Sequence, residues 1–375
     1  MTVALASLRD GTAVTLHRYV LRLRRPLATG RRTLRERRGL LLCLTDDEGR
    51  EGWGDAAPLE GFGGPGLATT ARSLERWLRG AGEVADAESL ARRADETLGG
   101  LPCAWAAVGG AAADLSARRR GTTLVALLGG AAAAAPGPLA GRVPTAALVG
   151  GESPAEVAAA AEAAVSEGFG TLKLKVGYRP LAHDAARVAA LREAAPDAGL
   201  RLDANGAWGG ESLGAAEALA RFEPEVLEEP CRGLDALRRL QSLTGVPIAA
   251  DESLPPLADL HRHLPLGTSA AVLKPSALGG PSAVVAAAAA LADSGTAAIV
   301  GSFLESAVGV AAAAHVAAAA GGPPAGLATS AMLQDDVCEP LRVTDGAVRL
   351  PAASGLGLAP DPGRLARLRD GGNGG

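Results

Sequence analysis

The chain has few of the residues that usually carry zinc sites, disulfide frameworks or aromatic clusters. Only 3% of its 375 residues are aromatic, so we expect alanine, valine and leucine to build most of the core. The cysteines form no CxxC pair, which excludes a disulfide framework and a zinc site and favours reduced, buried thiols. The histidines show no ligand spacing, and we interpret them as surface or structural groups. These residues are Cys43, Cys103, Cys231 and Cys338, and His17, His183, His261, His263 and His315.

The chain also lacks a strong charge excess and a long apolar run. It holds 37 basic and 41 acidic residues, a net charge of −4, which gives no electrostatic basis for binding nucleic acid. An apolar run such as 284–292 is too short to span a membrane. Arg9 and Asp10 interrupt the stretch where a signal peptide would need its apolar segment. We therefore expect a cytoplasmic protein that binds neither nucleic acid nor membranes.

A local exception to this balance is the arginine-dense stretch from Arg18 to Arg38. Its simplest interpretation is a solvated face of strands and loops. The alternative is that one of these arginines contacts an anionic substrate. The sequence leaves both interpretations open.

The length of the chain and a change in its pattern of expected strands and helices indicate two domains. A chain of 375 residues suits two domains better than one. Residues 1–135 read as strands followed by helices, which is typical of an α+β domain. A stretch rich in alanine, glycine and proline at 129–141 marks the expected boundary. The expected strands of this first domain are 14–23, 37–44 and 51–54, and the expected helices are 67–78, 83–98 and 102–119.

From residue 136 to 332, strands and helices alternate regularly. Ser153 and Pro154 provide a cap and a first-turn proline for one of the helices. The pattern predicts an α/β fold: a (β/α)8-type barrel covered by an α+β capping domain. That capping domain comprises residues 1–135, with the tail at 333–375 as its expected second part. The eight expected barrel strands are 143–149, 171–176, 200–204, 226–228, 247–250, 271–274, 297–301 and 326–328.

Five charged residues recur at the ends of successive barrel strands. They are Lys175, Asp203, Glu228, Asp251 and Lys274, which are 28, 25, 23 and 23 residues apart. A βα unit needs roughly this length, so each residue falls at the end of one strand. A single charged strand end is usually an exposed loop residue, but five at a regular period indicate a catalytic barrel mouth.

The chemistry of these five charged residues, the charged ladder, favours a metal-assisted proton transfer. Asp203, Glu228 and Asp251 would repel one another, and a hard cation such as Mg²⁺ would relieve that repulsion. The two lysines lie on strands 2 and 6, on opposite sides of the carboxylates. A nearby cation and the ammonium of Lys173 should lower the pKa of Lys175, which favours its use as a base. Asn205, Glu229 and Glu252 suit either supporting hydrogen-bonding positions or direct participation in the site.

Short motifs around these residues are also diagnostic as a set. The chain resembles the enolase superfamily in these motifs, and specifically its muconate-lactonising subgroup. The ending at 355–358 also resembles that of the subgroup. Within the subgroup the chain is most similar to the o-succinylbenzoate synthase family, through residues 50–59, 201–208, 227–231 and 301–306. The superfamily motifs are Lys173-Leu174-Lys175, Leu202-Asp203-Ala204-Asn205, Glu228-Glu229-Pro230, Ala250-Asp251-Glu252-Ser253 and Leu273-Lys274-Pro275.

The resemblance implies roles for the ladder residues. Asp203, Glu228 and Asp251 would bind Mg²⁺. Lys175 would remove the proton alpha to the substrate carboxylate and then assist departure of a hydroxyl on the same face. Lys274 would stabilise the developing charge from the opposite face. The remaining residues implied to bind substrate or support the site are Lys173, Arg201, Asn205, Glu229, Ser302 and Glu305, with Ser302, Glu305 and the loop at 59–66 facing the pocket.

The implied reaction is a dehydration in menaquinone biosynthesis. The substrate would be 2-succinyl-6-hydroxy-2,4-cyclohexadiene-1-carboxylate, and the products o-succinylbenzoate and water. The expected partner is thus a small carboxylate, and the oligomeric state stays open. An N-acylamino acid racemase or a muconate cycloisomerase would use the same Mg²⁺ and lysines, and a metal-binding scaffold without turnover is a third interpretation.

Two departures from related families bear on these alternatives. Dipeptide epimerases of the superfamily carry an Asp-x-Asp element near strand 8. Here the comparable acidic residues are Asp335 and Asp336, in a different setting, which counts against an epimerase. The run from Gly301 to Phe303 replaces a more usual small polar run, so Phe303 should alter the shape of the pocket.

Overall fold

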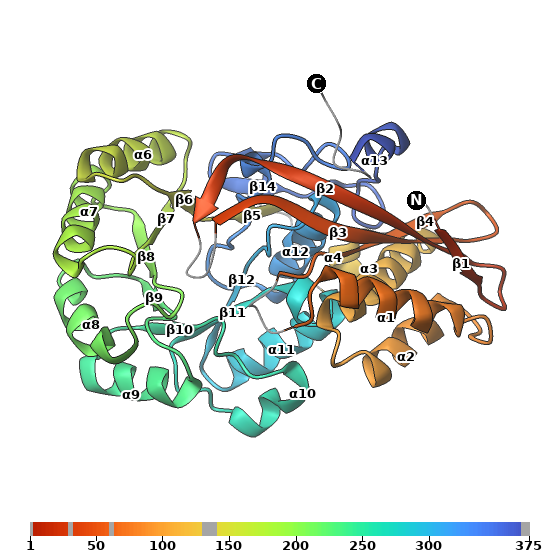
Figure 1. Ribbon diagram of the computed structural model, residues 1–375, viewed down its shortest axis with the longest axis horizontal. Helices are drawn as coiled ribbons and strands as arrows, with labels where there is room; N and C mark the ends of the chain where they lie inside the picture. Colours follow the sequence, from red (N-terminus) through yellow and green to blue (C-terminus); the bar gives the residue numbers. More distant parts are fainter. Residues whose placement is uncertain (1–2, 29–32, 60–63, 130–140, 369–375) are drawn as a thin grey trace.

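The computed structural model describes residues 3–28, 33–59, 64–129 and 141–368 (Figure 1). Two of the sequence expectations fall largely on the other residues. Of the expected boundary at 129–141, residues 130–140 lie outside the described part, and of the expected pocket loop at 59–66, so do residues 60–63.

An antiparallel sheet of four strands and a layer of helices form the capping domain. The strands follow the order β1-β2-β3-β4. In Figure 1 the long β2–β3 hairpin runs from the capping domain across the barrel. Leucines of this hairpin are buried while most of its arginines are exposed, the alternation that a half-covered strand requires. The elements are β1 (Val3–Ser7), β2 (Ala13–Ala28), β3 (Thr33–Thr45), β4 (Glu51–Ala56), α1 (Leu67–Arg79), α2 (Ala87–Thr97), α3 (Pro102–Arg119) and α4 (Leu124–Leu127).

Direct packing of α3 on β4 explains two glycines of the capping domain. A Cβ atom at Gly52 would lie 2.3 Å from the carbonyl oxygen of Ala111, and one at Gly54 would lie 1.9 Å from that of Ala107. Both distances are far below van der Waals contact, so only glycine allows this approach of helix and strand.

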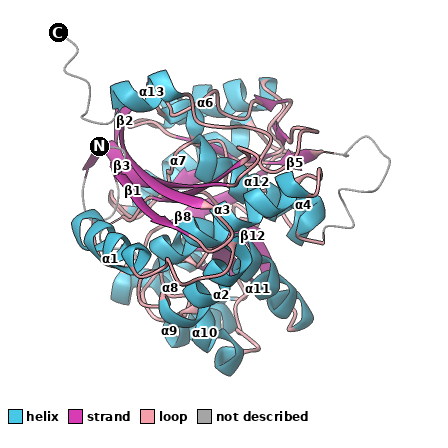
Figure 2. Cartoon of the chain, turned by 90° about the vertical axis from the view of Figure 1, so that its right-hand side faces the viewer, coloured by secondary structure: helices cyan, strands magenta, loops and turns pink. Residues whose placement is uncertain are grey.

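A curled parallel sheet of seven strands forms the barrel, with the order β12-β11-β10-β9-β8-β7-β6. Helices surround these strands in Figure 2. The strands are β6 (Ala147–Val149), β7 (Thr171–Lys175), β8 (Gly199–Asp203), β9 (Val226–Glu228), β10 (Ile248–Ala250), β11 (Ala270–Leu273) and β12 (Ala297–Val300). The helices are α6 (Pro154–Ser166), α7 (Leu181–Ala194), α8 (Ser212–Ala220), α9 (Leu234–Thr244), α10 (Leu257–Leu260), α11 (Pro281–Asp293) and α12 (Ala307–Ala320), with 3₁₀ turns at Gly209–Glu211, His261–His263, Pro275–Ala277 and Ser330–Met332.

The eighth barrel strand predicted at 326–328 is an isolated pair of bridges rather than a strand. Gly326 pairs with Gly301 beyond β12, and Ala325 pairs with Thr145 before β6. These bridges connect the two edges of the seven-stranded sheet. The predicted barrel is therefore confirmed. Two bridges, at Ala325 and Gly326, close it in place of an eighth strand.

The strand predicted at 143–149 is divided into two strands in different sheets. Its first part, β5 (Arg142–Pro144), pairs antiparallel with β14 (Ala347–Arg349), which also pairs with β13 (Val343–Thr344). The chain changes partners at Thr145, whose hydroxyl donates to the carbonyl of Ala325 at 2.7 Å. A pattern of apolar residues does not reveal such a change of partner.

The tail returns to the capping domain, as the fold prediction requires. Leu333 bridges to Leu23, and the backbone N–H of Leu356 donates to the carboxylate of Asp114 at 2.7 Å. The last helix, α13 (Pro362–Leu368), packs against β2. Tail residues that are buried in the core of the capping domain are Leu333, Val337, Cys338, Leu356 and Leu365.

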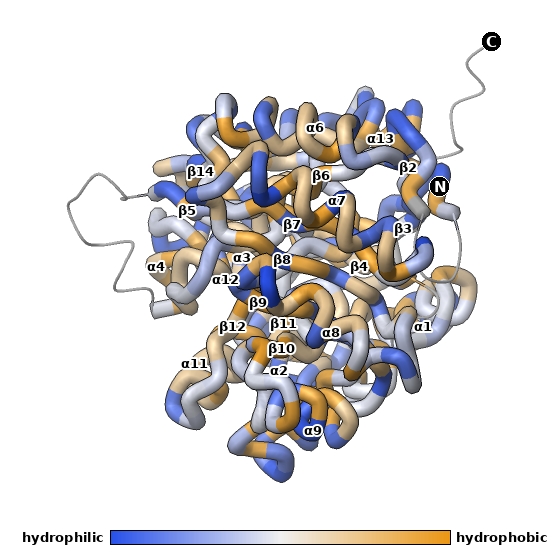
Figure 3. Tube along the Cα trace, turned by 90° about the vertical axis from the view of Figure 1, so that its left-hand side faces the viewer, coloured by the Kyte–Doolittle hydropathy of each residue, from blue (hydrophilic) through white to orange (hydrophobic). Residues whose placement is uncertain are grey.

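Alanine, valine and leucine build most of both cores, as the low aromatic content predicts. The alanine-rich helices α6 and α11 carry hydrophobic colour over much of their length in Figure 3. A capping box starts α6: the hydroxyl of Ser153 accepts from the N–H of Glu156, and the Glu156 carboxylate accepts from that of Ser153. None of the described helices is both long and apolar enough to cross a membrane.

Candidate active site

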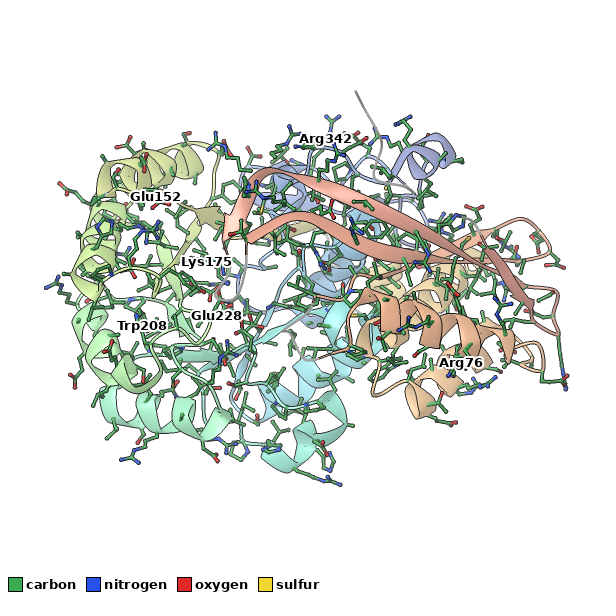
Figure 4. All side chains as sticks on the ribbon, viewed as in Figure 1. Arg76, Glu152, Lys175, Trp208, Glu228 and Arg342 are labelled. Atoms are coloured by element: carbon green, nitrogen blue, oxygen red, sulfur yellow. The ribbon has the colours of Figure 1, made fainter. Side chains whose placement is uncertain are left out.

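Strand register brings the charged ladder together at one end of the barrel. Lys175 on β7 pairs with Asp203 on β8, and Asp203 pairs with Glu228 on β9. Asp251 and Lys274 directly follow β10 and β11. Figure 4 shows Lys175 and Glu228 near each other within the ring of barrel helices. The strand-end cluster consists of Lys173, Lys175, Asp203, Glu228, Asp251 and Lys274.

Ion pairs connect the lysines of this cluster to its carboxylates. The ammonium of Lys173 lies 2.7 Å from Glu228 Oε2 and 2.8 Å from Asp203 Oδ2. Lys175 Nζ lies 3.1 Å from Asp203 Oδ2. On the other side, Lys274 Nζ donates to Asp251 Oδ1 at 2.6 Å. Lys173, expected as a substrate contact, is thus a central member of the cluster.

Burial and neighbouring charges shift the pKa values in the cluster. Burial opposes the ammonium form of Lys173, but Asp203 and Glu228 outweigh it and raise the pKa of this lysine. Burial also opposes the carboxylate form of Asp203, yet Lys173 and Lys175 hold its pKa below the usual range. Burial and the Asp203 carboxylate raise the pKa of Glu228. Negative charge is therefore concentrated around Glu228.

Asn205, which follows β8, connects Lys175 of the cluster to Glu252, the neighbour of Asp251. Its side-chain oxygen accepts from Lys175 and from the hydroxyl of Tyr178, while its amide nitrogen donates to Glu252 at 3.1 Å. The backbone of Asn205 is left-handed, with φ 44°. Asparagine adopts this conformation more readily than most other non-glycine residues.

Glu229, the neighbour of Glu228, organises the end of β10. Its carboxylate accepts from the backbone N–H groups of Asp251, at 2.9 Å, and Ser253, at 3.2 Å. Glu229 is fully buried and also has a left-handed backbone, with φ 43°. Its side chain therefore holds Asp251 in place, which fits the predicted supporting role.

A cavity adjoins the cluster and reaches from the barrel to the β2–β3 hairpin. Ser302 lies in its wall, and its hydroxyl is 2.7 Å from that of Thr329. Sequence reasoning missed Thr329 because it lies in the irregular segment after the weak eighth strand. The lining residues include Leu27, Leu34 and Leu59 from the capping domain, and Leu148, Val272, Ile299, Phe303 and Met332 from the barrel, beside the cluster itself.

Arg201 and Glu305, both expected at the site, point elsewhere with their charged groups. Arg201 lines the cavity, but its guanidinium donates to the carbonyl of Pro324 at 2.7 Å and contacts Glu225. Glu305 is fully buried and is not part of the described cavity wall. Its carboxylate accepts from the hydroxyl of Ser276 at 2.6 Å.

The acidic pair Asp335 and Asp336 lies outside the cavity wall. Asp336 is buried and accepts from the backbone N–H of Ala307 at 2.9 Å, which caps α12. This pair therefore has a structural partner, in agreement with its different sequence setting.

The donor atoms of the cluster fit a hard divalent cation in kind. The side chains of Asp203, Glu228 and Asp251 are at most 7% exposed and lie at the ends of three neighbouring strands, and oxygen is the ligand atom that Mg²⁺ prefers. In the part of the chain that the structure describes, no three His, Cys, Asp or Glu side chains are grouped as ligands of one ion. The Lys173 ammonium lies between Asp203 and Glu228.

The lysine content of the chain is concentrated at this site. Of the 37 basic residues, only three are lysines, and all three belong to the strand-end cluster. Arginine keeps its proton at any ordinary pH, whereas lysine can lose it. A count of lysines alone would have pointed to these positions.

Two family models match the chain. One is described as enolase C-terminal domain-like and matches residues 156–364, and the other is the MenC N-terminal domain and matches residues 12–106. The o-succinylbenzoate synthase of Mycobacterium tuberculosis (strain H37Rv) is 38% identical over 230 residues, which cover 57% of this chain and 67% of that protein.

Two solved structures share nearly the whole fold. The muconate lactonizing enzyme from Pseudomonas fluorescens, complexed with muconolactone, has a TM-score of 0.86 and 25% identity, over 95% of this chain and 98% of that chain. The dipeptide epimerase from Cytophaga hutchinsonii, complexed with Mg and the dipeptide D-Ala-L-Val, has a TM-score of 0.84 and 26% identity, over 95% of this chain and 97% of that chain.

Proposed function

The chain belongs to the enolase superfamily, through its enolase C-terminal-like and MenC N-terminal domains, and from this premise we propose that it is an o-succinylbenzoate synthase. Its reaction converts 2-succinyl-6-hydroxy-2,4-cyclohexadiene-1-carboxylate to o-succinylbenzoate and water, in menaquinone biosynthesis. The proposed partner is this small carboxylate. The four buried cysteines carry free thiols, which favours the cytoplasmic location that we also propose.

The placement of the three lysines carries the proposal. Lys173 and Lys175 stand on β7, and Lys274 follows β11, with three strands between them. Both sides border the same cavity. A chain that otherwise uses only arginine for positive charge has lysine where a proton must be taken up and released.

The proposed mechanism divides the work between the two lysines that face each other. Lys175, as the neutral amine, takes the proton alpha to the substrate carboxylate. The resulting ammonium then donates that proton to the departing hydroxyl on the same face, so that water leaves and the ring becomes aromatic. Lys274 remains an ammonium and stabilises negative charge that develops on the substrate carboxylate. Lys173 contacts that carboxylate.

We further propose that Asp203, Glu228 and Asp251 hold one Mg²⁺ ion. Their oxygen donors and the low exposure of their side chains support this assignment, as does the Mg in the structure of the related epimerase. When bound, Mg²⁺ stabilises negative charge on the substrate carboxylate. Glu229 orients Asp251 through its backbone N–H, and Asn205 orients Lys175.

A racemase activity is the second candidate, and the opposed lysines favour it. One lysine could remove the alpha proton of an N-acylamino acid while the other returns a proton to the opposite face. Single Lys175→Ala and Lys274→Ala variants test this. If racemisation is native, each variant retains exchange of the alpha proton with solvent for one enantiomer only.

Direct measurement of product with and without metal tests the main proposal. Purified protein with Mg²⁺ should release o-succinylbenzoate from the cyclohexadiene substrate. Full removal of metal with EDTA should stop release, and added Mg²⁺ should restore it. Absence of product with Mg²⁺ present would overturn the proposed activity, and product formation unaffected by EDTA would overturn the metal assignment.

A further inference from the structure

Arg37 differs from its neighbours in the arginine-rich hairpin because its side chain is buried. Arg35 and Arg38, on the same strand, are exposed, whereas Arg37 is only 3% exposed. The exposed members fit the solvated face that the sequence suggested. Arg37 needs another explanation, because burial of a guanidinium is costly unless its donors are satisfied.

The guanidinium of Arg37 joins two segments that are far apart in the sequence. It donates to the carbonyls of Ala57, at 2.6 Å, and Pro58, at 3.2 Å, just after β4 in the capping domain. It also donates to the carbonyls of Leu304, at 3.0 Å, and Phe303, at 3.2 Å, in the loop after β12. The guanidinium of one arginine therefore connects the capping domain to the loop after β12, the seventh barrel strand.

The loop at 302–306 depends on such side-chain contacts for its shape. The N–H of Phe303 donates to the Glu305 carboxylate, and that of Leu304 donates to the hydroxyl of Ser302 at 2.9 Å. Leu304 has a left-handed backbone, with φ 57°. A bulky residue in this conformation persists only where its surroundings impose it.

Asp55 provides a second attachment between the capping domain and this loop. Its buried carboxylate accepts from the hydroxyl of Tyr19 at 2.8 Å and from the N–H of Ser306 at 2.9 Å. Gly309 on α12 leaves room for the side chains of Glu305 and Asp55. A Cβ atom at this position would lie 2.1 Å from Glu305 Cγ and 3.2 Å from Asp55 Oδ2. The cap-interface cluster consists of Tyr19, Arg37, Asp55, Glu305 and Ser306.

The cap-interface cluster reaches the strand-end cluster at Lys274. The ring of Phe303 contacts two cations, with its centroid 5.9 Å from the Arg37 guanidinium and 5.8 Å from Lys274 Nζ. Glu305 also accepts from Ser276, two residues after Lys274. Contiguous contacts therefore lead from a strand of the capping domain to one lysine of the proposed site.

We infer that Arg37 is a positioning residue that couples the seating of the capping domain to the placement of Lys274. It holds the carbonyls of the loop at 302–306, which places the Phe303 ring against the lysine. The Lys274 side of the site is then formed only when the capping domain is docked on the barrel. The kinetic consequence rests on the proposed function, whereas the structural coupling does not.

Hydrogen exchange tests the structural coupling without any assay of activity. In Arg37→Met, the amides of Phe303, Leu304 and Ser306 should exchange about 10-fold faster, because local opening of the loop becomes easier. Peptides from α7 should stay unchanged. Arg38→Met is the matched control, since it removes an exposed guanidinium from the same strand and should leave the loop unaffected.

Amine labelling tests whether the effect reaches Lys274. The chain has only three lysines, so an acetylating reagent read by mass spectrometry reports on the strand-end cluster almost exclusively. Arg37→Met and Phe303→Leu should each raise labelling of Lys274 by about 3-fold or more, through greater local opening. Labelling of Lys173, on β7, should change less than that of Lys274.

Steady-state kinetics then separate positioning from general structural support. Displaced catalytic groups cost up to about 100-fold in rate, so kcat should fall by about 10-fold to 100-fold in Arg37→Met, with a smaller change in KM. Arg37→Lys keeps the charge without the fork and should recover part of kcat. If Arg37 acts through Phe303, the double variant Arg37→Met with Phe303→Leu should lose no more kcat than the worse single variant.

Three results would overturn the inference. They are exchange in Arg37→Met equal to that of Arg38→Met, unchanged labelling of Lys274 in Phe303→Leu, and multiplicative kcat losses in the double variant. If Arg37→Met does not fold, Arg37→Lys and Phe303→Leu carry the same exchange and kinetic measurements. Faster loop exchange in a protein without o-succinylbenzoate synthase activity would support the coupling and reject the proposed function.

Discussion

The strand-end cluster and the cap-interface cluster both bury charged side chains, but they satisfy those charges differently. In the strand-end cluster, ammonium groups pair with carboxylates at the wall of a cavity. In the cap-interface cluster, Arg37 and Asp55 bond mainly to carbonyls, hydroxyls and backbone N–H groups. Charges paired with charges can exchange partners with a charged ligand, whereas charges held by neutral groups fix one geometry.

The largest expected effect follows from removal of the proposed base. Lys175→Ala should lower kcat by about 10²-fold to 10⁴-fold, the usual contribution of a general base. Lys175→Arg is the matched control, because it keeps the positive charge of the cluster but cannot give up its proton. Both variants should lose activity alike in the product assay. Retention of more than about a tenth of kcat by Lys175→Arg would show that charge, not proton transfer, is the role.

The next effect concerns Mg²⁺ and the carboxylate around which negative charge is concentrated. Glu228→Gln removes one charged donor and should weaken Mg²⁺ binding by about 10-fold to 100-fold in calorimetric titration. Glu225→Gln, which changes a half-exposed glutamate just before β9, should leave Mg²⁺ binding unchanged. Equal Mg²⁺ affinity in Glu228→Gln and the unmodified protein would remove Glu228 from the metal site.

A pH-dependent effect should come from the cap-interface cluster. Burial outweighs the hydrogen bonds from Ser306 and Tyr19 and raises the pKa of Asp55 to about 7, whereas an unfolded aspartate titrates near 3.8. The folded form therefore binds the proton more tightly in this window. Stability should fall as pH rises from about 4 to about 7, by at most about 1.4 kcal/mol per pH unit.

Asp55→Asn tests this titration, because asparagine has no carboxyl proton to lose. The variant should lack this part of the pH dependence in thermal unfolding between about pH 4 and pH 7. Asp345→Asn, which changes an exposed aspartate, serves as the control and should follow the unmodified protein. Parallel pH profiles for Asp55→Asn and the unmodified protein would contradict the raised pKa.

The smallest effect is expected for an ion pair that belongs to neither cluster. Arg38 and Glu36 pair at 2.6 Å on the exposed face of β3, with side chains 62% and 38% exposed. Glu36→Gln should change the free energy of unfolding by less than about 1 kcal/mol and leave kcat unchanged. A larger change in urea titration would mean that the hairpin surface contributes to the fold as Arg37 does.

The strand-end cluster could be predicted from the sequence because each member lies in a short motif at the end of its own strand. A parallel βα repeat brings the carboxyl ends of its strands to one edge, so the spacing of Asp203, Glu228 and Asp251 was enough to place them together. The side of the barrel on which each lysine lies followed from strand number alone. The ion pairs of Lys173 did not follow, because side-chain direction depends on the register of three strands.

The cap-interface cluster could not be predicted in this way. Arg37 bonds to residues more than 260 positions away, and no local pattern distinguishes it from the exposed Arg35 and Arg38. Glu305 was expected at the cavity from the family resemblance, yet its carboxylate lies beside Gly309 and accepts from Ser276. The divided strand at 143–149 failed for the same reason, since the change of partner at Thr145 depends on Gly346 and Ala325.

The core of the capping domain combines segments that are synthesised before the barrel with segments that are synthesised after it. Strands β2 and β3 leave the ribosome before the barrel strands, while Leu333, Val337 and Leu356 leave it after them. The barrel strands lie in one continuous stretch between these segments, and can assemble while the capping core still lacks its last side chains. A nascent chain that stops before Leu333 would therefore hold every barrel strand beneath an unfinished capping domain, with apolar surface available to chaperones and proteases.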